Sequence, residues 1–415
     1  MTLNRVALAL TIALASTSIA AAPAVAKDQK DQKASAATER KYDISAGARK
    51  PIGDLQAAIN AKDTANIPAK LAAAQAAVKT TDDKYVVAKL HLQTVIGSNN
   101  DAAIVSALEE IAASGGADPA ELEKVYLNAA QISYNSKDFA RASTNLTQAL
   151  KLDPNNVDAN VLMAETLNSA GRTSEAVVLI RKAIATKAAS GQKPDETWYR
   201  RAVGFANQAN LPVVNDAALD WVKAYPSPKN WRDTLRIYLS SNNIDPTAGL
   251  DVSRLMYTTN AMASEADYFR LASPLLAKGF PGEAKIVLDK GIASGAITKQ
   301  SASIGALYSS AAAKSVGDQA SLAGAAKTTL AGPSAAKVVV IGDAYAGYGD
   351  YAKAIDLYKS ALAKTGADKD LINLHLGMAL AKSGDKAGAM AALSAVGGAQ
   401  AGVAKLWLAY VSTVG

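Results

Sequence analysis

Two near-copies of one short segment constrain the fold of this chain more than any other feature. The stretch GDYAKAIDLYKSAL, from Gly349 to Leu362, is followed about 35 residues later by GDKAGAMAALSAV, which begins at Gly384. Upstream, the small residue Ala142 recurs about 34 residues later as Ala176. A period near 34 residues, with a helical spacing of apolar side chains, is typical of stacked pairs of helices. The sequence therefore predicts an array of αα-hairpins.

The amino-terminal residues have the pattern of a secretory signal. Arg5 precedes an apolar run from Val6 to Ala15, and small residues then lead to Ala26, where cleavage is expected. The next residues are polar and almost without large apolar side chains, which favours a flexible segment. We therefore expect a signal peptide at 1–26, a flexible polar leader at 27–43, and a helical solenoid at 44–415. A bacterial protein of this kind is expected to be periplasmic or secreted.

Composition narrows the classes of function. The chain has no cysteine, which excludes disulfides, cysteine nucleophiles and a lipid anchor attached to cysteine. Its formal net charge of +7 is spread along the chain, without the clusters of lysine and arginine that are typical of nucleic-acid binding. No segment after the signal has the roughly 18 uninterrupted apolar residues of a membrane-spanning helix. We expect neither a nucleic-acid partner nor a membrane span.

The helical spacing continues from Ile44 onward and divides the chain into about ten pairs of helices, separated by glycine and proline turn signals. The unit near Ser301 is expected to be an alanine-rich pair, and Gln400–Val414 a last helix that caps the exposed end of the stack. The first helices of the pairs are expected to begin near Pro51, Asp83, Glu121, Val157, Asp195, Pro228, Glu265, Ser301, Ala335 and Asp370.

The pattern of small and large residues resembles the tetratricopeptide repeat family. One matching pair supplies Tyr126, Ala130, Ala142, Ala149 and Pro154, and a later one supplies Gly342, Tyr345, Gly349, Ala354, Tyr358 and Ala361. The resemblance is strongest at 121–190, 265–294 and 335–396, and it implies an all-α fold, a right-handed superhelix of αα-hairpins. Small residues are expected where paired helices cross at short distance.

Patterns that indicate catalysis or metal binding are weak. His91 and His375 are the only histidines, and each is more simply a hydrogen-bonded or solvent-facing side chain than part of a shared site. The run Val338–Gly349 superficially resembles a glycine-rich phosphate loop, but the repeat explains its glycines as helix-crossing and turn residues. The segment Asp153–Asp158 lacks the glycine and distal glutamate of a calcium loop. We predict no enzyme activity, no cofactor and no bound metal.

One cluster of aromatic and arginine residues, between Trp198 and Tyr238, stands out from the rest of the chain. Such side chains are strong binding anchors, and packing of the tryptophans in the core is the alternative interpretation. The family resemblance implies that first helices line a concave surface. Carried over by position, the candidate groove residues are Tyr134, Asn135, Asn168, Tyr199, Asn207, Arg232 and Arg236.

These observations favour a non-catalytic scaffold of the bacterial envelope that binds a partner protein segment, acidic or neutral, in its concave groove. A carbohydrate-binding accessory of polysaccharide export or cell-wall processing is the alternative, because tryptophan and tyrosine faces stack on sugars. Its partner would be an envelope glycan. An enzyme on a helical scaffold is the third hypothesis, although no set of acid, base and nucleophile can be named for it.

Overall fold

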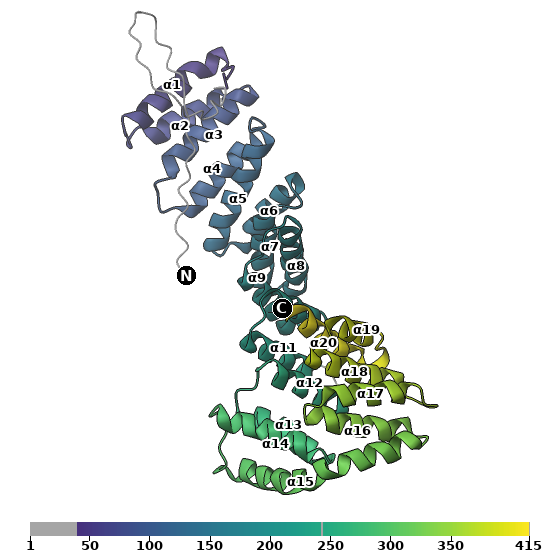
Figure 1. Cartoon of the computed structure of the whole chain (residues 1–415). Coiled ribbons are helices and arrows are strands. Elements are labelled where there is room, and N and C mark those ends of the chain that lie inside the picture. Colours follow the sequence, from purple (N-terminus) through teal and green to yellow (C-terminus); the bar gives the residue numbers. More distant parts are fainter. Residues whose placement is uncertain (1–39, 242–243, 415) are drawn as a thin grey trace, which may run out of the picture. The chain divides into compact units, whose positions relative to one another are not determined.

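The computed structural model describes residues 40–241 and 244–414 of the chain. The expected signal peptide, 1–26, lies outside these residues, as do residues 27–39 of the expected leader. The described residues fold into 20 α-helices and one short 3-10 helix (Figure 1). The predictions of an all-α class and of paired successive helices are confirmed. The chain divides into two compact units, 1–152 and 153–415, and each is described by itself.

Three helical pairs make up the described part of the first unit, and each pair packs against the next. Their facing sides bury aliphatic side chains, and Leu55, Leu90, Leu108 and Ile111 have no exposed surface. Removing these apolar side chains from water is the main stabilising contribution in such an array. The helices are α1 (Ala46–Asn60), α2 (Ile67–Ala77), α3 (Thr81–Val95), α4 (Asp101–Ala113), α5 (Pro119–Asn135) and α6 (Phe139–Leu152).

A buried carboxylate holds the beginning of this unit together. Asp83, in the first turn of α3, has no exposed surface and accepts hydrogen bonds from the backbone N–H groups of Ser45 and Thr80. Burial alone would raise the pKa of Asp83, but the hydrogen bonds outweigh burial and hold the pKa well below its ordinary value. Before α1, Arg40 forms an ion pair with Asp82 at 3.0 Å, so this end of the expected leader contacts α3.

Six helical pairs, a long helix after the fourth pair and a final helix make up the described part of the second unit. Several helices begin where the sequence predicted, including α7 at Val157 and α11 at Pro228. The helices are α7 (Val157–Ser169), α8 (Thr173–Ala189), α9 (Glu196–Gln208), α10 (Val214–Ala224), α11 (Pro228–Ser241), α12 (Pro246–Thr258), α13 (Glu265–Ala277), α14 (Pro281–Ala293), α15 (Ala302–Ala331), α16 (Ala335–Gly347), α17 (Tyr351–Leu362), α18 (Lys369–Ser383), α19 (Lys386–Ser394), η1 (Gly398–Gln400) and α20 (Ala401–Thr413).

The helix pair expected near Ser301 is instead a single helix, α15, of 30 residues. Several turns between helices in this chain use a glycine in the left-handed region, such as Gly349 at a φ of +84°. Gly317 and Gly324 do not adopt positive φ, and the alanines around them are the strongest helix formers. The segment therefore continues as one helix. No helix in the described part of the chain, α15 included, is both long enough and apolar enough to cross a membrane.

Close helix crossings occur where the repeat pattern predicted small residues. A Cβ added at Gly342 of α16 would lie 2.7 Å from the Tyr358 ring on α17. Ala354 has no exposed surface. The run Val338–Gly349 forms α16 and the turn after it, so its interpretation as part of a helical repeat is confirmed.

The end of the second unit packs back against earlier helices. Helix α20 contacts α10 and α12 as well as α18 and α19 (Figure 1). The ring of Tyr410 meets Trp231 of α11 edge-on, with 6.3 Å between the ring centroids. Gly402 permits the close approach, because a Cβ there would lie 2.2 Å from the hydroxyl of Tyr238. Helices α10–α20 therefore form a closed ring, which the sequence did not predict.

Candidate functional site

A cleft of about 380 Å³ lies between α12, α16 and α18 of the second unit. Most of its walls are apolar, with Leu250 from α12, Phe280 from the turn before α14, Val339 from α16 and Ile372 from α18. Val340 also lines the cleft and is 50% exposed. The remaining lining residues are Thr247, Arg254, Lys278, Ala336, Asp343, Gly366, Asp368, Leu371 and His375.

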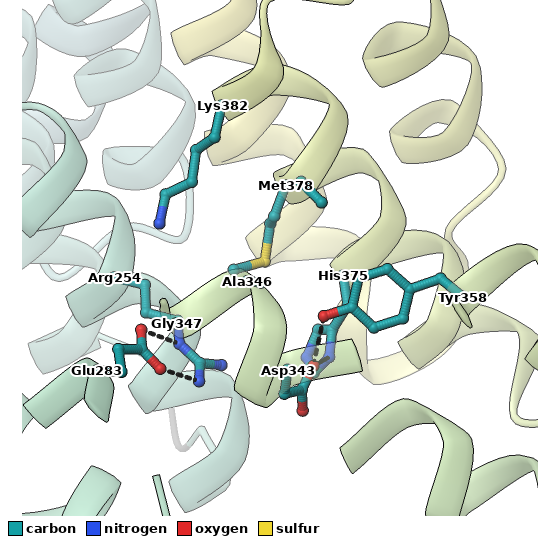
Figure 2. A pocket seen from close by; sticks show the side chains of 10 residues that line it. Arg254, Glu283, Asp343, Ala346, Gly347, Tyr358, His375, Met378 and Lys382 are labelled. Atoms are coloured by element: carbon teal, nitrogen blue, oxygen red, sulfur yellow. Dashed lines mark hydrogen bonds and ion pairs between the residues drawn. The ribbon is translucent and has the colours of Figure 1, made fainter. Parts of the chain in front are cut away.

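Three of the lining residues belong to a group of buried charges that we call the buried charge network (Figure 2). Its members are Asp251, Arg254, Glu283, Asp343 and His375. Arg254 donates to both carboxylate oxygens of Glu283, at 2.9 and 2.7 Å, and to Asp251 at 2.9 Å. The ring of His375 contacts Asp343 through Nδ1 at 2.7 Å and Asp251 through Nε2 at 3.3 Å. The network thus joins four helices, α12, α14, α16 and α18.

The protonation of His375 follows from its surroundings. Burial alone would lower the pKa of His375, but the carboxylates of Asp343 and Asp251 outweigh burial and raise the pKa to about 10. Burial also disfavours the charged form of Asp251, yet His375 and Arg254 hold the pKa of Asp251 below its ordinary value. At neutral pH, His375 is therefore protonated and donates a hydrogen bond from each ring nitrogen.

A second, smaller cavity lies beside the network and is lined in part by Arg254, Glu283 and Lys382. Its volume of about 20 Å³ is enough for roughly one water molecule. Figure 2 shows Lys382 extending from α18 toward the Arg254 side of the cavity. Its ammonium lies 5.7 Å from the ring centroid of Tyr351, and burial lowers its pKa.

The geometry suits binding better than catalysis. A general base needs a free lone pair, but both ring nitrogens of His375 are held by carboxylates. The hydroxyl of Tyr358 donates a hydrogen bond to Asp343 at 2.7 Å, so it is engaged in the network as well. In the part of the chain that the structure describes, no group of three or more His, Asp or Glu side chains is arranged to hold a metal ion.

The candidate groove residues predicted from the sequence lie elsewhere, and none of the seven lines the cleft. Tyr134 and Asn135 belong to α5 of the first unit, whereas the other five belong to the second unit. Tyr199 is only 7% exposed and its ring packs edge-on against Tyr225. Asn207 is exposed on α9. The oxygen of the Asn168 amide accepts a hydrogen bond from the hydroxyl of Thr173 at 3.1 Å.

The two candidate arginines make contacts within the second unit. Nε of Arg232 donates to the carbonyl of Ala261 at 2.9 Å. Arg236 forms an ion pair with Asp267 at 3.0 Å, although 48% of the arginine side chain remains exposed. Arg232 thus joins α11 to the segment before α13, and Arg236 joins α11 to the first turn of α13. Binding of a partner by the predicted groove residues stays a prediction.

The tryptophans near these arginines pack in the core. Trp221 and Trp231 are 5% and 4% exposed, and Trp198 packs against the same core as Trp221. The indole N–H of Trp221 donates to Glu196 at 3.0 Å. Trp221 and Trp231 are therefore core residues, whereas Trp198 is partly buried at the edge of the core. The carbohydrate alternative stays a prediction.

Reasoning from the sequence did not find the cleft or the buried charge network. A usable signal was present in α12, where Asp251 and Arg254 stand among the apolar residues Leu250, Val252 and Leu255. Charged side chains at the buried positions of a helix require partners, because an unpaired buried charge is costly. Their partners, however, come from helices far away in the sequence, and no local pattern names them.

Two segments of the chain match known family models. Tetratricopeptide repeat models match residues 134–192 and residues 339–402. These segments overlap two of the regions where the sequence pattern was strongest, 121–190 and 335–396. A search among curated proteins finds no match.

Several solved structures are similar to this chain at low sequence identity. A tetratricopeptide repeat protein from Parabacteroides merdae is 15% identical, with 62% of this chain and 98% of that chain covered and a TM-score of 0.26. The structure of Naa15/Naa10 bound to HypK-THB is 12% identical, with coverages of 84% and 57% and a TM-score of 0.32. The tetratricopeptide repeat domain of P58(IPK) is 12% identical, with coverages of 82% and 99% and a TM-score of 0.22.

Proposed function

Because this chain is a tetratricopeptide repeat protein, with matched repeats at 134–192 and 339–402, we propose that it is a non-catalytic interaction module that binds a segment of a partner protein in the cleft of its second unit. The observation that supports this site is the combination in its lining of mostly apolar side chains with three charged ones, Arg254, Asp343 and His375, that hydrogen bonds hold in place. Its volume of about 380 Å³ falls in the range of ligand pockets, roughly 300–1,000 Å³.

The partner segment inserts a bulky apolar side chain between α12, α16 and α18. Burying such a side chain fully contributes about 1.5–3 kcal/mol, and polar contacts at the edge of the cleft then orient the segment. Two exposed residues of opposite charge, Lys278 and Asp368, are available for those contacts. Because one of these residues is positive and the other negative, they favour neither acidic nor basic segments. The bulky apolar side chain of the segment, and not its net charge, therefore determines which partners bind.

A pair of valine substitutions tests the cleft. Val340→Asp places a carboxylate among the apolar walls, whereas Val316→Asp makes the same change on α15, where the valine is 75% exposed and lines no part of the cleft. A photo-crosslinking amino acid at position 340 in intact cells first identifies the partner and its contact segment. Purified partner should then bind Val340→Asp about 10- to 100-fold more weakly than wild type, since each 1.4 kcal/mol lost is a factor of ten.

Val316→Asp is the control for this test. Val316→Asp should bind like the wild type, and both variants should have wild-type helical content by circular dichroism. If Val340→Asp binds the partner as tightly as Val316→Asp, or if the crosslinked segment lacks a bulky apolar residue, the cleft is not the binding site.

We further propose that the protein works in the bacterial envelope, as a periplasmic or secreted protein. The support is the pattern of residues 1–26, a short basic start, an apolar run and small residues before Ala26. Residues 1–30 fused to a reporter enzyme that is active only after export should yield activity in a bacterial host. A fusion in which charged residues replace part of the apolar run Val6–Ala15 should be inactive, and equal activity of the two fusions would refute export.

A further inference from the structure

The contact between His375 and Asp251 closes the ring of helices in the second unit. The two residues are 124 positions apart, and the 3.3 Å contact joins α18 near the end of the chain to α12. His375 is 5% exposed and Asp251 has no exposed surface. On its other side, His375 contacts Asp343 of α16 at 2.7 Å. One imidazole therefore joins three helices inside the protein.

This joint requires a proton on His375. A protonated imidazole donates to both carboxylates, whereas a neutral imidazole has one N–H group and turns a nitrogen lone pair toward the other carboxylate. Arg254 and protonated His375 face the three carboxylates of the buried charge network. Removing the proton would take a positive charge away from between Asp251 and Asp343 in a buried site, which is strongly unfavourable.

No neighbouring group is placed to replace that proton. The charged and titratable groups around His375 are Asp251 and Arg254 on α12, Glu283 on α14, Asp343 on α16, Tyr358 on α17 and Lys382 on its own helix. Arg254 is held by Glu283 through two hydrogen bonds, and the hydroxyl of Tyr358 already donates to Asp343. The ammonium of Lys382 lies beside the ring of Tyr351.

We propose that closing of the α10–α20 ring takes up a proton at His375, and that this proton-coupled closing regulates the cleft, whose lining includes the same residue. The regulatory part rests on the proposed function of the cleft, whereas the closing reaction does not. When the ring opens, α18 and α20 separate from α10 and α12, and His375 loses Asp251 and becomes accessible to water, while Asp343 of α16 stays beside it. The walls of the cleft then no longer face each other, because α12 and α18 form two of them.

The size of the coupling follows from the two environments of the imidazole. A solvated histidine has a pKa of about 6.5, and burial beside two carboxylates raises it to about 10 in the closed ring. Because Asp343 stays beside the imidazole, the pKa of His375 in the open ring lies between these two values, and from there up to about 10 the closing equilibrium constant falls by about tenfold for each pH unit. From pH 7 to pH 9 the decrease is therefore smaller than the roughly 70-fold that complete solvation would give.

Backbone hydrogen exchange of the full chain, measured without any partner, tests the proposal. Amides of α20 (Ala401–Thr413) exchange when this helix unfolds, which becomes easier once the open ring has removed its packing on α10 and α12, so their protection reports ring opening even if the open form is rare. After correction for the intrinsic pH dependence of exchange, protection of α20 should fall from pH 7 to pH 9, by no more than roughly 70-fold. Protection of α8 (Thr173–Ala189), in the same unit but outside the ring, should not change.

Two histidine substitutions provide the contrast. In His375→Gln, α20 should be less protected than in the wild type at pH 7, and its protection should not fall further by pH 9. The matched variant His91→Gln removes the other histidine, which lies in the first unit, and should keep the wild-type pH dependence. Equal protection of α20 at both pH values in the wild type, or an unchanged fall in His375→Gln, would overturn the proposal.

A second measurement covers the case in which His375→Gln does not fold. The chain has only two histidines, so the imidazole Cε1–H signals of the wild type and His91→Gln assign the signal of His375. This signal should remain that of the protonated ring up to about pH 9. A titration near pH 6.5 in the folded protein would overturn the proposal. Neither experiment involves a partner, so failure here and failure of the Val340→Asp test are distinguishable.

Discussion

The substitution Gly342→Ala tests the helix packing more sharply than any other single change. A Cβ at this position of α16 would lie 2.7 Å from Cε1 of Tyr358, 3.0 Å from its Cδ1 and 3.2 Å from its Cζ. The Tyr358 ring is 2% exposed, and its hydroxyl is held by a hydrogen bond to Asp343 at 2.7 Å. The added methyl group must therefore separate α16 from α17 or break this hydrogen bond.

The expected magnitude combines three effects. Overpacking of a helix crossing costs about 1–3 kcal/mol, and loss of the Tyr358 hydrogen bond costs about 0.5–1.5 kcal/mol more. Alanine is a better helix former than glycine by about 1 kcal/mol, which offsets part of the loss. We expect the free energy of unfolding to fall by about 1–3 kcal/mol.

The matched control is Gly324→Ala in α15. Gly324 is exposed inside a helix, and among the described residues no atom other than its chain neighbours and the nearby backbone of its own helix lies within 4 Å of the position that its Cβ would occupy. The same substitution should therefore stabilise the protein, by up to about 1 kcal/mol. One chemical change is thus expected to have opposite signs at two helical glycines.

Urea unfolding followed by tryptophan fluorescence measures both variants. All four tryptophans, Trp198, Trp221, Trp231 and Trp407, belong to the second unit, which also contains both glycines. With a common slope, a lower midpoint means lower stability. Midpoints that shift in the same direction for Gly342→Ala and Gly324→Ala would refute the assigned crossing of α16 and α17.

Three further outcomes are expected. The pKa of His375 is raised to about 10 in the folded protein, so the stabilising contribution of its protonated ring is complete below pH 6.5 and is lost as the pH rises toward 10. The midpoint of thermal unfolding, measured by calorimetry, should therefore fall over this pH range, and in His375→Gln it should depend less on pH. Ala354→Leu should cost about 1–3 kcal/mol in urea unfolding, because Ala354 has no exposed surface, and an unchanged midpoint would contradict the repeat register. Arg254→Met should cost about 3–5 kcal/mol, since it leaves Glu283 and Asp251 without their guanidinium partner, and adding Glu283→Gln should restore part of the loss.

Local features of the sequence were sufficient to predict the helical pairs. The glycines at 342 and 349 indicated a close crossing and a turn, and the structure has Gly342 against Tyr358 and Gly349 at positive φ. The prediction failed at α15, where the period suggested a turn but the local residues favour a continuous helix. A repeat period describes the average unit, whereas a turn requires residues that interrupt backbone hydrogen bonding at that place.

The candidate site could not be predicted in the same way. His375 was expected to be hydrogen-bonded or solvent-facing, and the structure buries it between two carboxylates from α12 and α16. Neither the sequence separation of 124 positions between His375 and Asp251 nor the apolar residues around His375 indicates that the two side chains meet. The groove residues carried over from the repeat pattern lie outside the cleft, because the pattern locates side chains on single helices and not the hollows between distant ones.

The sequence by itself determined that this chain forms paired helices, because each pair is specified by small, large and turn-forming residues within about 34 positions. Only the tertiary structure decided that α20 returns to α10 and α12, and that the charges of α12, α14, α16 and α18 meet in one buried network. The physical reason is that each pair is rotated slightly relative to the one before it, and whether the ring closes depends on the sum of these small rotations. No single residue pattern encodes that sum, whereas one close contact such as Gly342 against Tyr358 is encoded locally.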